Sequence, residues 1–119
     1  MGFVTLFLVL SFSLNTIENN WVEGFDQLNK AFDSRVRMGV MSILIVNSWV
    51  SYKELKQLLD LTDGNLASHI NALEKLNYLE VKKQFIGKKP LTTYRITKIG
   101  KTSFEQHING LEKLIQGSI

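Results

Sequence analysis

Small polar side chains between residues 63 and 77 could form hydrogen bonds with the edges of nucleic-acid bases. Asn65 is able to bind adenine through two hydrogen bonds, and a serine such as Ser68 can contact several bases. Gly64 would let the backbone approach a phosphate. In addition, the N-terminus of a helix favours an anion. Taken alone, the same residues are equally consistent with an ordinary solvent-exposed surface. The choice between these two interpretations therefore depends on the neighbouring segments.

A lysine-rich segment follows and could neutralise phosphates. The four lysines are Lys82, Lys83, Lys88 and Lys89. Gly87 allows a narrow tip that reaches the minor groove or the flanking backbone, and Arg95 follows on the returning strand. Lysines on an exposed hairpin edge also prevent the addition of another strand, and both roles can hold together. Four lysines within eight residues exceed what an edge needs, which favours contact with phosphates.

Two short helices joined by a tight turn are expected to position these side chains. Ser51 and Glu54 match a capping box, which opens a helix that ends near Asp60. Thr62 is the N-cap candidate of the next helix, which runs from about residue 63 to residue 77. A turn this short is what a helix-turn-helix requires.

Apolar residues at helical spacing predict which face of each helix is buried. In the first of the two helices the inward side chains are Leu55, Leu58 and Leu59. In the second they are Leu66, Ile70 and Leu73. The outward residues of the second helix are then Asn65, Ser68, His69, Ala72 and Lys75. The polar set is therefore expected on an exposed face.

Two flanking segments have the periodicity of core-facing helices. The upstream apolar set is Phe25, Leu28, Phe32, Val36, Val40, Ile43 and Leu44. The Asp33-Ser34 pair interrupts that set, and Asn47-Ser48 ends it. Downstream, Thr97 caps a last helix whose apolar residues are Phe104, Ile108, Leu111 and Ile115. This last stripe needs an apolar partner, which in so small a chain could be a second copy.

Alternating apolar residues on both sides of Gly87 predict a β-hairpin. The apolar residues of its first strand are Leu79, Val81 and Phe85, on its half-buried side. The alternating residues of its second strand are Thr92, Tyr94 and Ile96. Residues 87–90 are expected to form the turn, and Trp49-Val50 is a short extended piece before the capping box.

The distribution of charge is more informative than the net charge of +3. Residues 51–101 contain ten Lys and Arg against five Asp and Glu, whereas the rest of the 119-residue chain contains four against six. A basic middle suggests a polyanionic partner, although a solvated lysine-rich surface is the plain alternative. With 45% hydrophobic and 21% charged residues, the composition is that of one small globular domain.

No set of residues suited to catalysis or metal binding is recognisable in the sequence. The chain has no cysteine, which excludes disulfides, thiolate metal sites and cysteine nucleophiles. The two histidines, His69 and His107, fall on different helices without a carboxylate at a zinc spacing. Phosphate loops, nucleophile elbows and paired carboxylates are absent. We therefore expect neither an enzyme nor a cofactor.

The apolar run Gly2–Leu14 has three interpretations. It is shorter than the ~20 residues of a transmembrane helix, no Lys or Arg precedes it, and no A-x-A-like cleavage site follows. It could form a helix that packs on the domain or on a partner subunit. It could consist of residues without function that an upstream start codon adds. It could also be a segment that associates with a membrane. We treat residues 1–20 as an extension and residues 21–119 as the domain. A cytoplasmic location without a membrane partner is expected, which the absence of cysteine fits.

Arg35 and Arg37 lie on the mostly apolar helix that ends near residue 44. They could extend to the surface and pair with Asp33 or Glu54. They could also add positive charge near a nucleic-acid backbone. We favour the structural role for both arginines.

Together these features resemble the small winged-helix transcriptional regulators of the MarR and ArsR groups. The resemblance covers roughly residues 25–114. The matching stretches are Phe32–Arg37, Tyr52–Leu55, Leu61–Ile70, Leu73–Leu79, Gly87–Pro90 and Tyr94–Thr97. Such regulators often have acidic residues after the closing threonine, whereas Lys98-Ile99 follows Thr97 here, and the run 2–14 has no counterpart.

The resemblance implies a mainly α fold with a small β-hairpin, a winged helix-turn-helix whose terminal helices form a homodimer on a palindromic DNA operator. The 63–77 helix would be the recognition helix and residues 79–96 the wing. The DNA-binding residues would be Thr62, Gly64, Asn65, Ser68, His69, Lys75, Lys82, Lys83, Lys88, Lys89 and Arg95. The dimer interface would contain Phe104, Ile108, Leu111 and Ile115.

The sequence leaves open whether the protein binds a small-molecule effector and whether its partner is DNA or another protein. A small-molecule effector could bind between the dimer helix and the core, but no convergent polar set identifies one. A winged helix that binds only other proteins is the alternative function. That alternative would require an apolar patch on the outward face of the 63–77 helix, where Asn65, Ser68 and His69 stand instead.

Overall fold

The computed structural model describes residues 21–117, so the interpretations of the apolar run Gly2–Leu14 lie outside the described residues. The described chain forms two compact units. The first comprises residues 29–104, and the second comprises residues 21–28 together with residues 105–117.

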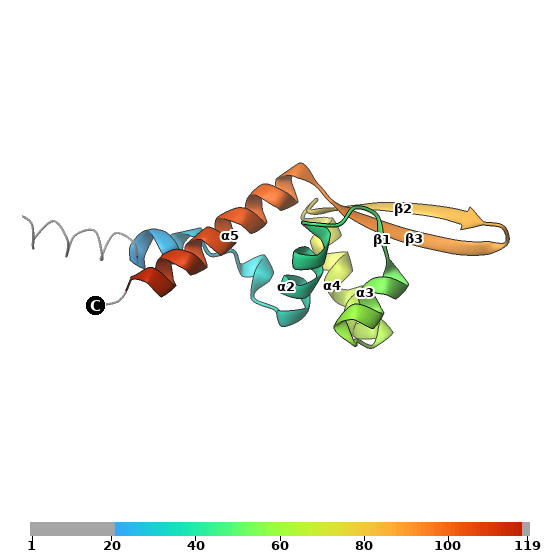
Figure 1. Cartoon of the computed structure of the whole chain (residues 1–119), viewed down its shortest axis with the longest axis horizontal. Coiled ribbons are helices and arrows are strands. Elements are labelled where there is room, and N and C mark those ends of the chain that lie inside the picture. Colours follow the sequence, from blue (N-terminus) through green and yellow to red (C-terminus); the bar gives the residue numbers. More distant parts are fainter. Residues whose placement is uncertain (1–20, 118–119) are drawn as a thin grey trace, which may run out of the picture. The chain divides into compact units, whose positions relative to one another are not determined.

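Three helices and a three-stranded sheet make up most of the unit of residues 29–104 (Figure 1). Its elements in chain order are η1 (Lys30–Phe32), α2 (Arg35–Leu44), β1 (Val50–Ser51), α3 (Tyr52–Leu59), α4 (Asp63–Lys75), β2 (Leu79–Ile86), β3 (Lys89–Ile96) and the start of α5 (Lys98–Gln116). The β2–β3 hairpin extends away from the cluster of α2, α3 and α4. The mainly helical fold with a small hairpin is thereby confirmed.

The helix-turn-helix forms through two local caps, as the sequence predicts. The Ser51 side chain accepts from the backbone of Glu54, whose carboxylate accepts from the Ser51 backbone, so the predicted capping box is confirmed. α3 ends before Asp60, which adopts a left-handed conformation with φ of 50°. Thr62 then caps α4 by accepting from the Asn65 backbone N–H at 3.3 Å. α4 ends at Lys75, two residues before the expected boundary.

The core of this unit lies between α2, α3, α4 and the stem of the hairpin. Its buried hydrophobic residues are Phe32, Val40, Met41, Leu44, Val50, Leu55, Leu66, Ile70, Leu73, Leu79, Tyr94 and Phe104. The predicted stripe of α4 is confirmed, since Leu66, Ile70 and Leu73 are all at most 1% exposed. Burial of this stripe fixes which residues of α4 remain outside.

One predicted core residue of α3 is exposed. The sequence pattern places Leu58 inward with Leu55 and Leu59, but 67% of its surface is accessible. Leu55 and Leu59 are one turn apart, and Leu59 packs against Gly39, where an added Cβ would lie 2.8 Å from the Leu59 Cδ2 atom. Leu58 lies to the side of that contact, at the rim of an open pocket.

The upstream helical pattern is divided into three pieces rather than two. Residues 21–27 are helical, η1 follows, and α2 begins only at Arg35. The Asn29 side chain accepts from the Ala31 backbone and caps η1, and the Ser34 side chain caps α2. Each cap starts a new helix, so Phe32 enters the core whereas Phe25 is 70% exposed.

The sheet has the antiparallel order β1-β3-β2. The hairpin turn is tighter than expected, because Ile86 already pairs with Lys89 and only Gly87 and Lys88 connect the strands. Gly87 has φ of +65°, a conformation that glycine adopts without strain. The predicted turn residues Lys89 and Pro90 therefore belong to β3.

Two details of the strands differ from the sequence pattern. Alternation places Phe85 on the half-buried side, but it is 74% exposed, because it lies near the tip of the hairpin where no helix covers the sheet. The second detail is that the short extended piece before α3 joins the sheet as β1. This strand has only two residues, of which Val50 pairs with Tyr94 and Ser51 with Thr93.

Thr97 joins the end of α4 to the start of α5. Its hydroxyl donates to the Asn77 carbonyl at 2.6 Å and accepts from the Gly100 N–H at 2.9 Å, while its own N–H donates to the Tyr78 carbonyl. The expected capping role of Thr97 is confirmed. Gly100 is required here, since an added Cβ would overlap the backbone of Tyr78.

The predicted assignment of Phe104 to a dimer interface is wrong. Its ring packs edge-on against Phe32 with centroids 5.3 Å apart, and only 3% of the residue is exposed. Phe104 lies near the start of α5, where this helix still covers the core of residues 29–104. It therefore contributes to that core and is not available to a second copy.

The second unit pairs helical residues 21–27 with the later part of α5. The Trp21 indole N–H donates to the Gly117 carbonyl, and Lys113 forms an ion pair with Glu23 at 3.0 Å. Gly24 lies against Gly110, so closely that an added Cβ at Gly24 would be 2.8 Å from the Gly110 carbonyl oxygen. Among residues 21–117, no helix combines the length and apolar character that crossing a membrane requires.

Replacing a leucine of the α4 stripe tests which residues hold the fold. We expect Leu66→Ala to lower the free energy of unfolding by about 2–5 kcal/mol, because it leaves a cavity in the core. The control Leu58→Ala changes an exposed leucine and should alter the free energy of unfolding by less than about 0.5 kcal/mol. Urea denaturation followed by circular dichroism measures both. Equal losses in the two variants would contradict the assignment of the core.

Candidate nucleic-acid interface

The outer side of α4 carries a continuous line of small or polar residues. The exposed residues opposite the buried stripe are Gly64, Ser68, Asn71 and Lys75. They recur every three or four positions and so share one face of the helix. Asn65 is exposed beside them. No large hydrophobic residue of Asp63–Lys75 is exposed, so this face is polar throughout.

Asn71 belongs to this face, although it is not among the outward residues expected from the sequence. Its position follows from the helical period, since it lies three residues after Ser68 and four before Lys75. The same period explains why His69 is half-buried. His69 lies closer to the edge of the buried stripe than Asn71 does, whereas Ala72, which is also half-buried, lies about as far from that edge as Asn71. The helical period around Leu66, Ile70 and Leu73 is by itself sufficient to place Asn71 on the exposed side.

The N-terminus of α4 is open to solvent. No atom lies within 4 Å of the position that a Cβ would take at Gly64, so packing does not require glycine there. The Thr62 hydroxyl already accepts the Asn65 N–H. Lys56 forms an ion pair with Asp63 at 3.0 Å, and the Tyr52 hydroxyl donates to the Asp63 carbonyl. These contacts hold the first turn of α4 against α3.

His69 is held from behind rather than pointing freely outward. The Arg37 Nε–H donates to the His69 Nδ1 atom at 3.0 Å, so this nitrogen accepts and the ring is neutral. Burial lowers the pKa of His69 below 6.5, and the positive charge of Arg37 lowers the pKa further. A neutral ring with Nδ1 as acceptor carries its hydrogen on Nε2. His69 therefore offers one donor at that atom.

The predicted partners of Arg37 are wrong, although its structural role is as expected. Its guanidinium donates to the Ala31 carbonyl at 3.3 Å and to His69, not to Asp33 or Glu54. Glu54 is engaged in the capping box with Ser51. Arg37 thus connects η1 to α4 through α2.

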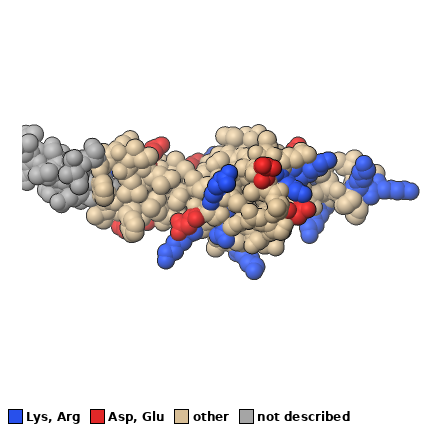
Figure 2. Space-filling model, turned by 90° about the horizontal axis from the view of Figure 1, so that it is seen from below, with Lys and Arg blue, Asp and Glu red and all other residues tan. Residues whose placement is uncertain are grey.

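The lysines of the hairpin project from both faces of the sheet. Lys82 pairs with Thr93 and Lys83 with Thr92, and successive residues of a strand point to opposite sides. Lys82, Lys83, Lys88 and Lys89 are all exposed. Figure 2 shows Lys and Arg side chains gathered towards the hairpin end of the residue 29–104 unit. The hairpin is therefore a positively charged arm.

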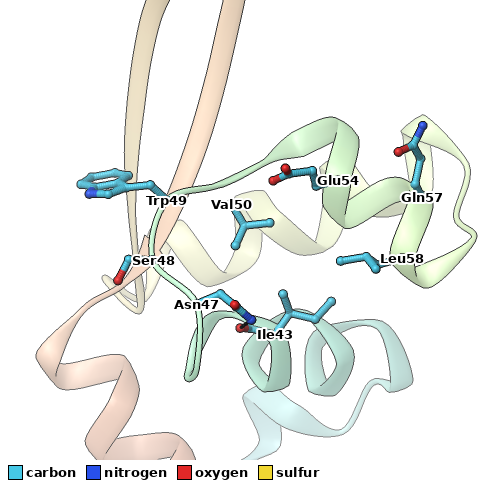
Figure 3. Close-up of a pocket in the computed structure, with 8 residues that line it drawn as sticks. All are labelled: Ile43, Asn47, Ser48, Trp49, Val50, Glu54, Gln57 and Leu58. Atoms are coloured by element: carbon cyan, nitrogen blue, oxygen red, sulfur yellow. Dashed lines mark hydrogen bonds between the residues drawn. The ribbon is translucent and has the colours of Figure 1, made fainter.

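Arg95 is less free than the lysines. It forms an ion pair with Glu80 at 2.5 Å, and its guanidinium lies over the Trp49 ring at 4.6 Å from the centroid. Lys82 lies over the same ring at 5.3 Å. Trp49, which Figure 3 labels beside the strands, has φ of 56° and precedes β1. Its indole thus connects the loop before β1 to the stem of the hairpin, a role that the sequence did not reveal.

An open pocket of about 590 Å³ lies between the end of α2, the loop before β1 and α3 (Figure 3). Ile43, Val50 and Leu58 form its apolar part. Its polar lining residues are Asn47, Ser48, Glu54 and Gln57. The Glu54 carboxylate is already occupied by the Ser51 N–H, so we assign no ligand to this pocket. Among residues 21–117, no group of His, Cys, Asp or Glu is arranged to hold a metal ion.

A solved structure resembles most of this chain. The chain has a TM-score of 0.65 to the transcriptional regulator homologue protein from Pyrococcus horikoshii, with 29% sequence identity over 77% of this chain and 96% of that chain. It is also 35% identical to the uncharacterized protein MJ0432 of Methanocaldococcus jannaschii, over 66% of this chain and 86% of that protein.

More distant structures share the fold alone. The S. aureus protein MepR in complex with DNA has a TM-score of 0.60 at 13% identity, covering 94% of this chain and 86% of that chain. A protein described as a MarR-like transcription regulator from Bacillus cereus has a TM-score of 0.58 at 18% identity, covering 98% and 82%. A family model described as a winged helix DNA-binding domain matches residues 36–115, and the chain belongs to that family.

Proposed function

We propose that the protein is a transcription regulator that binds double-stranded DNA as a homodimer, with α4 in the major groove. The polar outer face of α4, held in place by the fully buried stripe behind it, is the observation that carries the proposal. A module that binds only other proteins would need an apolar outer face on α4. The complex of the similar protein MepR with DNA supports the same conclusion.

Base reading is assigned to the exposed amides and the hydroxyl of α4. Asn65 and Asn71 each present a donor and an acceptor, which match the edge of adenine, and Ser68 adds a hydroxyl. His69 would donate from Nε2 to an acceptor such as guanine N7, while Arg37 keeps its ring in that tautomer. These short side chains let the helix approach the floor of the groove.

Phosphate contacts are assigned to the basic arm and to the start of α4. Lys75 at the end of α4 and the four lysines of the hairpin add positive charge without base selectivity. Gly64 leaves space for a phosphate at the N-terminus of α4, and the exposed Thr62 lies beside it. Arg95 would contribute less, because Glu80 already compensates its charge.

The dimer is assigned to the unit of residues 21–28 and 105–117. Trp21, Val22, Phe25 and Leu114 line an apolar hollow of about 360 Å³. Ile115 on the same unit is 80% exposed, whereas Ile108 and Leu111 are half-buried. A second copy would cover these residues, and a palindromic operator would require the two recognition helices to lie about 34 Å apart.

Removing two lysines of the arm tests the phosphate contacts. If each subunit neutralises about three to four phosphates, the logarithm of affinity falls with the logarithm of salt at a slope near −6. We expect Lys88→Ala with Lys89→Ala to weaken binding to all sequences and to flatten the slope by about one for each phosphate that is no longer neutralised. Fluorescence anisotropy on labelled duplexes measures both quantities.

The matched control for this pair is Lys98→Ala with Lys101→Ala. It removes the same charge from exposed positions at the start of α5 and should leave the slope nearly unchanged. A slope near zero for the unaltered protein would contradict DNA binding altogether.

Replacing Asn71 tests the reading face that the structure adds. Asn71→Ala should cost about 1–3 kcal/mol on a duplex selected from random fragments, because a base edge loses its partner. On unrelated duplexes it should have little effect. The control Asn109→Ala removes an exposed asparagine from α5 and should change neither affinity. Equal losses on selected and unrelated duplexes would remove Asn71 from the reading face.

A charge on the apolar side of the second unit tests the dimer. Ile115→Glu should yield a monomer in sedimentation velocity, because it would bury a carboxylate between the two copies. Ile99→Glu is the control, since Ile99 is exposed on the same helix within the other unit. An unchanged mass for Ile115→Glu would show that the copies associate elsewhere.

A further inference from the structure

The tip of the hairpin exposes two large apolar side chains that the fold does not use. Phe85 is 74% and Ile86 65% exposed, next to the turn formed by Gly87 and Lys88. Neither can contact the core, because the hairpin carries both away from the helices (Figure 1). Side chains of this size at the end of an exposed arm suggest a partner that covers them.

The apolar residues lie on both faces of a thin tip. Phe85 pairs directly with Pro90, and Ile86 pairs with Lys89, so the two pairs point to opposite sides of the ribbon. Around Gly87 no atom lies within 4 Å of a Cβ position, so nothing thickens the end of the hairpin. The shape is that of a narrow wedge rather than a flat patch.

The charged residues near this wedge indicate which kind of partner would cover it. Lys83 lies two residues before Phe85, Lys88 lies two residues after Ile86, and Lys89 pairs with Ile86. All three lysines are exposed. From residue 81 to residue 97 the chain contains no Asp or Glu. A second copy of this tip would bring like charges together, whereas a polyanion with an apolar interior would match both the lysines and the wedge.

We propose that the wing tip inserts Phe85 between two base pairs from the minor groove and thereby kinks the bound duplex, with Ile86 packed against the sugars. Stacked bases present the apolar interior, and the flanking phosphates accept the lysines. This inference rests on the proposed DNA-binding function. It adds that the wing selects sites by the ease with which one base step unstacks.

Fluorescence energy transfer between dyes at the ends of the selected duplex tests the kink. The unaltered protein should shorten the distance between the ends, and 2-aminopurine at the wedged step should become brighter. Phe85→Ser with Ile86→Ser should abolish both signals and weaken binding by roughly tenfold. The salt slope should stay the same, because no charge is removed.

The matched control is Val46→Ser with Leu58→Ser, which replaces two exposed apolar residues elsewhere in the residue 29–104 unit and should preserve both signals. If the tip variant binds and bends the duplex like the unaltered protein, the wedge is overturned while DNA binding stands. If the tip variant instead changes only the mass measured by sedimentation, the tip contacts a second copy of the chain and the proposal is wrong. Absence of duplex binding by the unaltered protein would overturn the proposed function itself.

Discussion

Burial of one side of α4 is the constraint on which the interface depends. Leu66, Ile70 and Leu73 are almost inaccessible to solvent, and α4 packs against both α2 and β2. Turning the helix by one residue, about 100°, would expose this stripe at a cost of about 1.5–3 kcal/mol for each side chain. The residues opposite are consequently fixed in direction before any ligand arrives, which limits the entropy lost on binding.

The parts of the fold that depend on neighbouring residues were predictable from the sequence. The Ser51 capping box, the Thr62 cap and the Thr97 cap are each decided within a few residues. The stripe of α4 and the pairing of the hairpin strands follow from simple periods of about 3.6 and 2. The same local logic placed Asn65 and Ser68 outside, and it would have placed Asn71 there too.

The remainder depends on contacts between residues distant in sequence. The bond between Arg37 and His69 spans 32 positions, and the stacking of Arg95 on Trp49 requires the loop before β1 to reach the hairpin. No local pattern encodes either contact. Phe104 was misassigned for the same reason, because its helical stripe does not reveal that the first turns of α5 cover Phe32 while later turns belong to another unit.

Ser51 belongs to two structures at once, since it pairs with Thr93 in the sheet and caps α3. A residue inserted or deleted at this junction would break the strand register or the cap, so the connection between arm and helix pair cannot change in length. The free end of the arm has no such restriction, because only Gly87 and Lys88 connect β2 to β3 and no atom lies within 4 Å of a Cβ position at Gly87. Evolution could therefore lengthen or shorten the hairpin at its tip while leaving the helix-turn-helix intact.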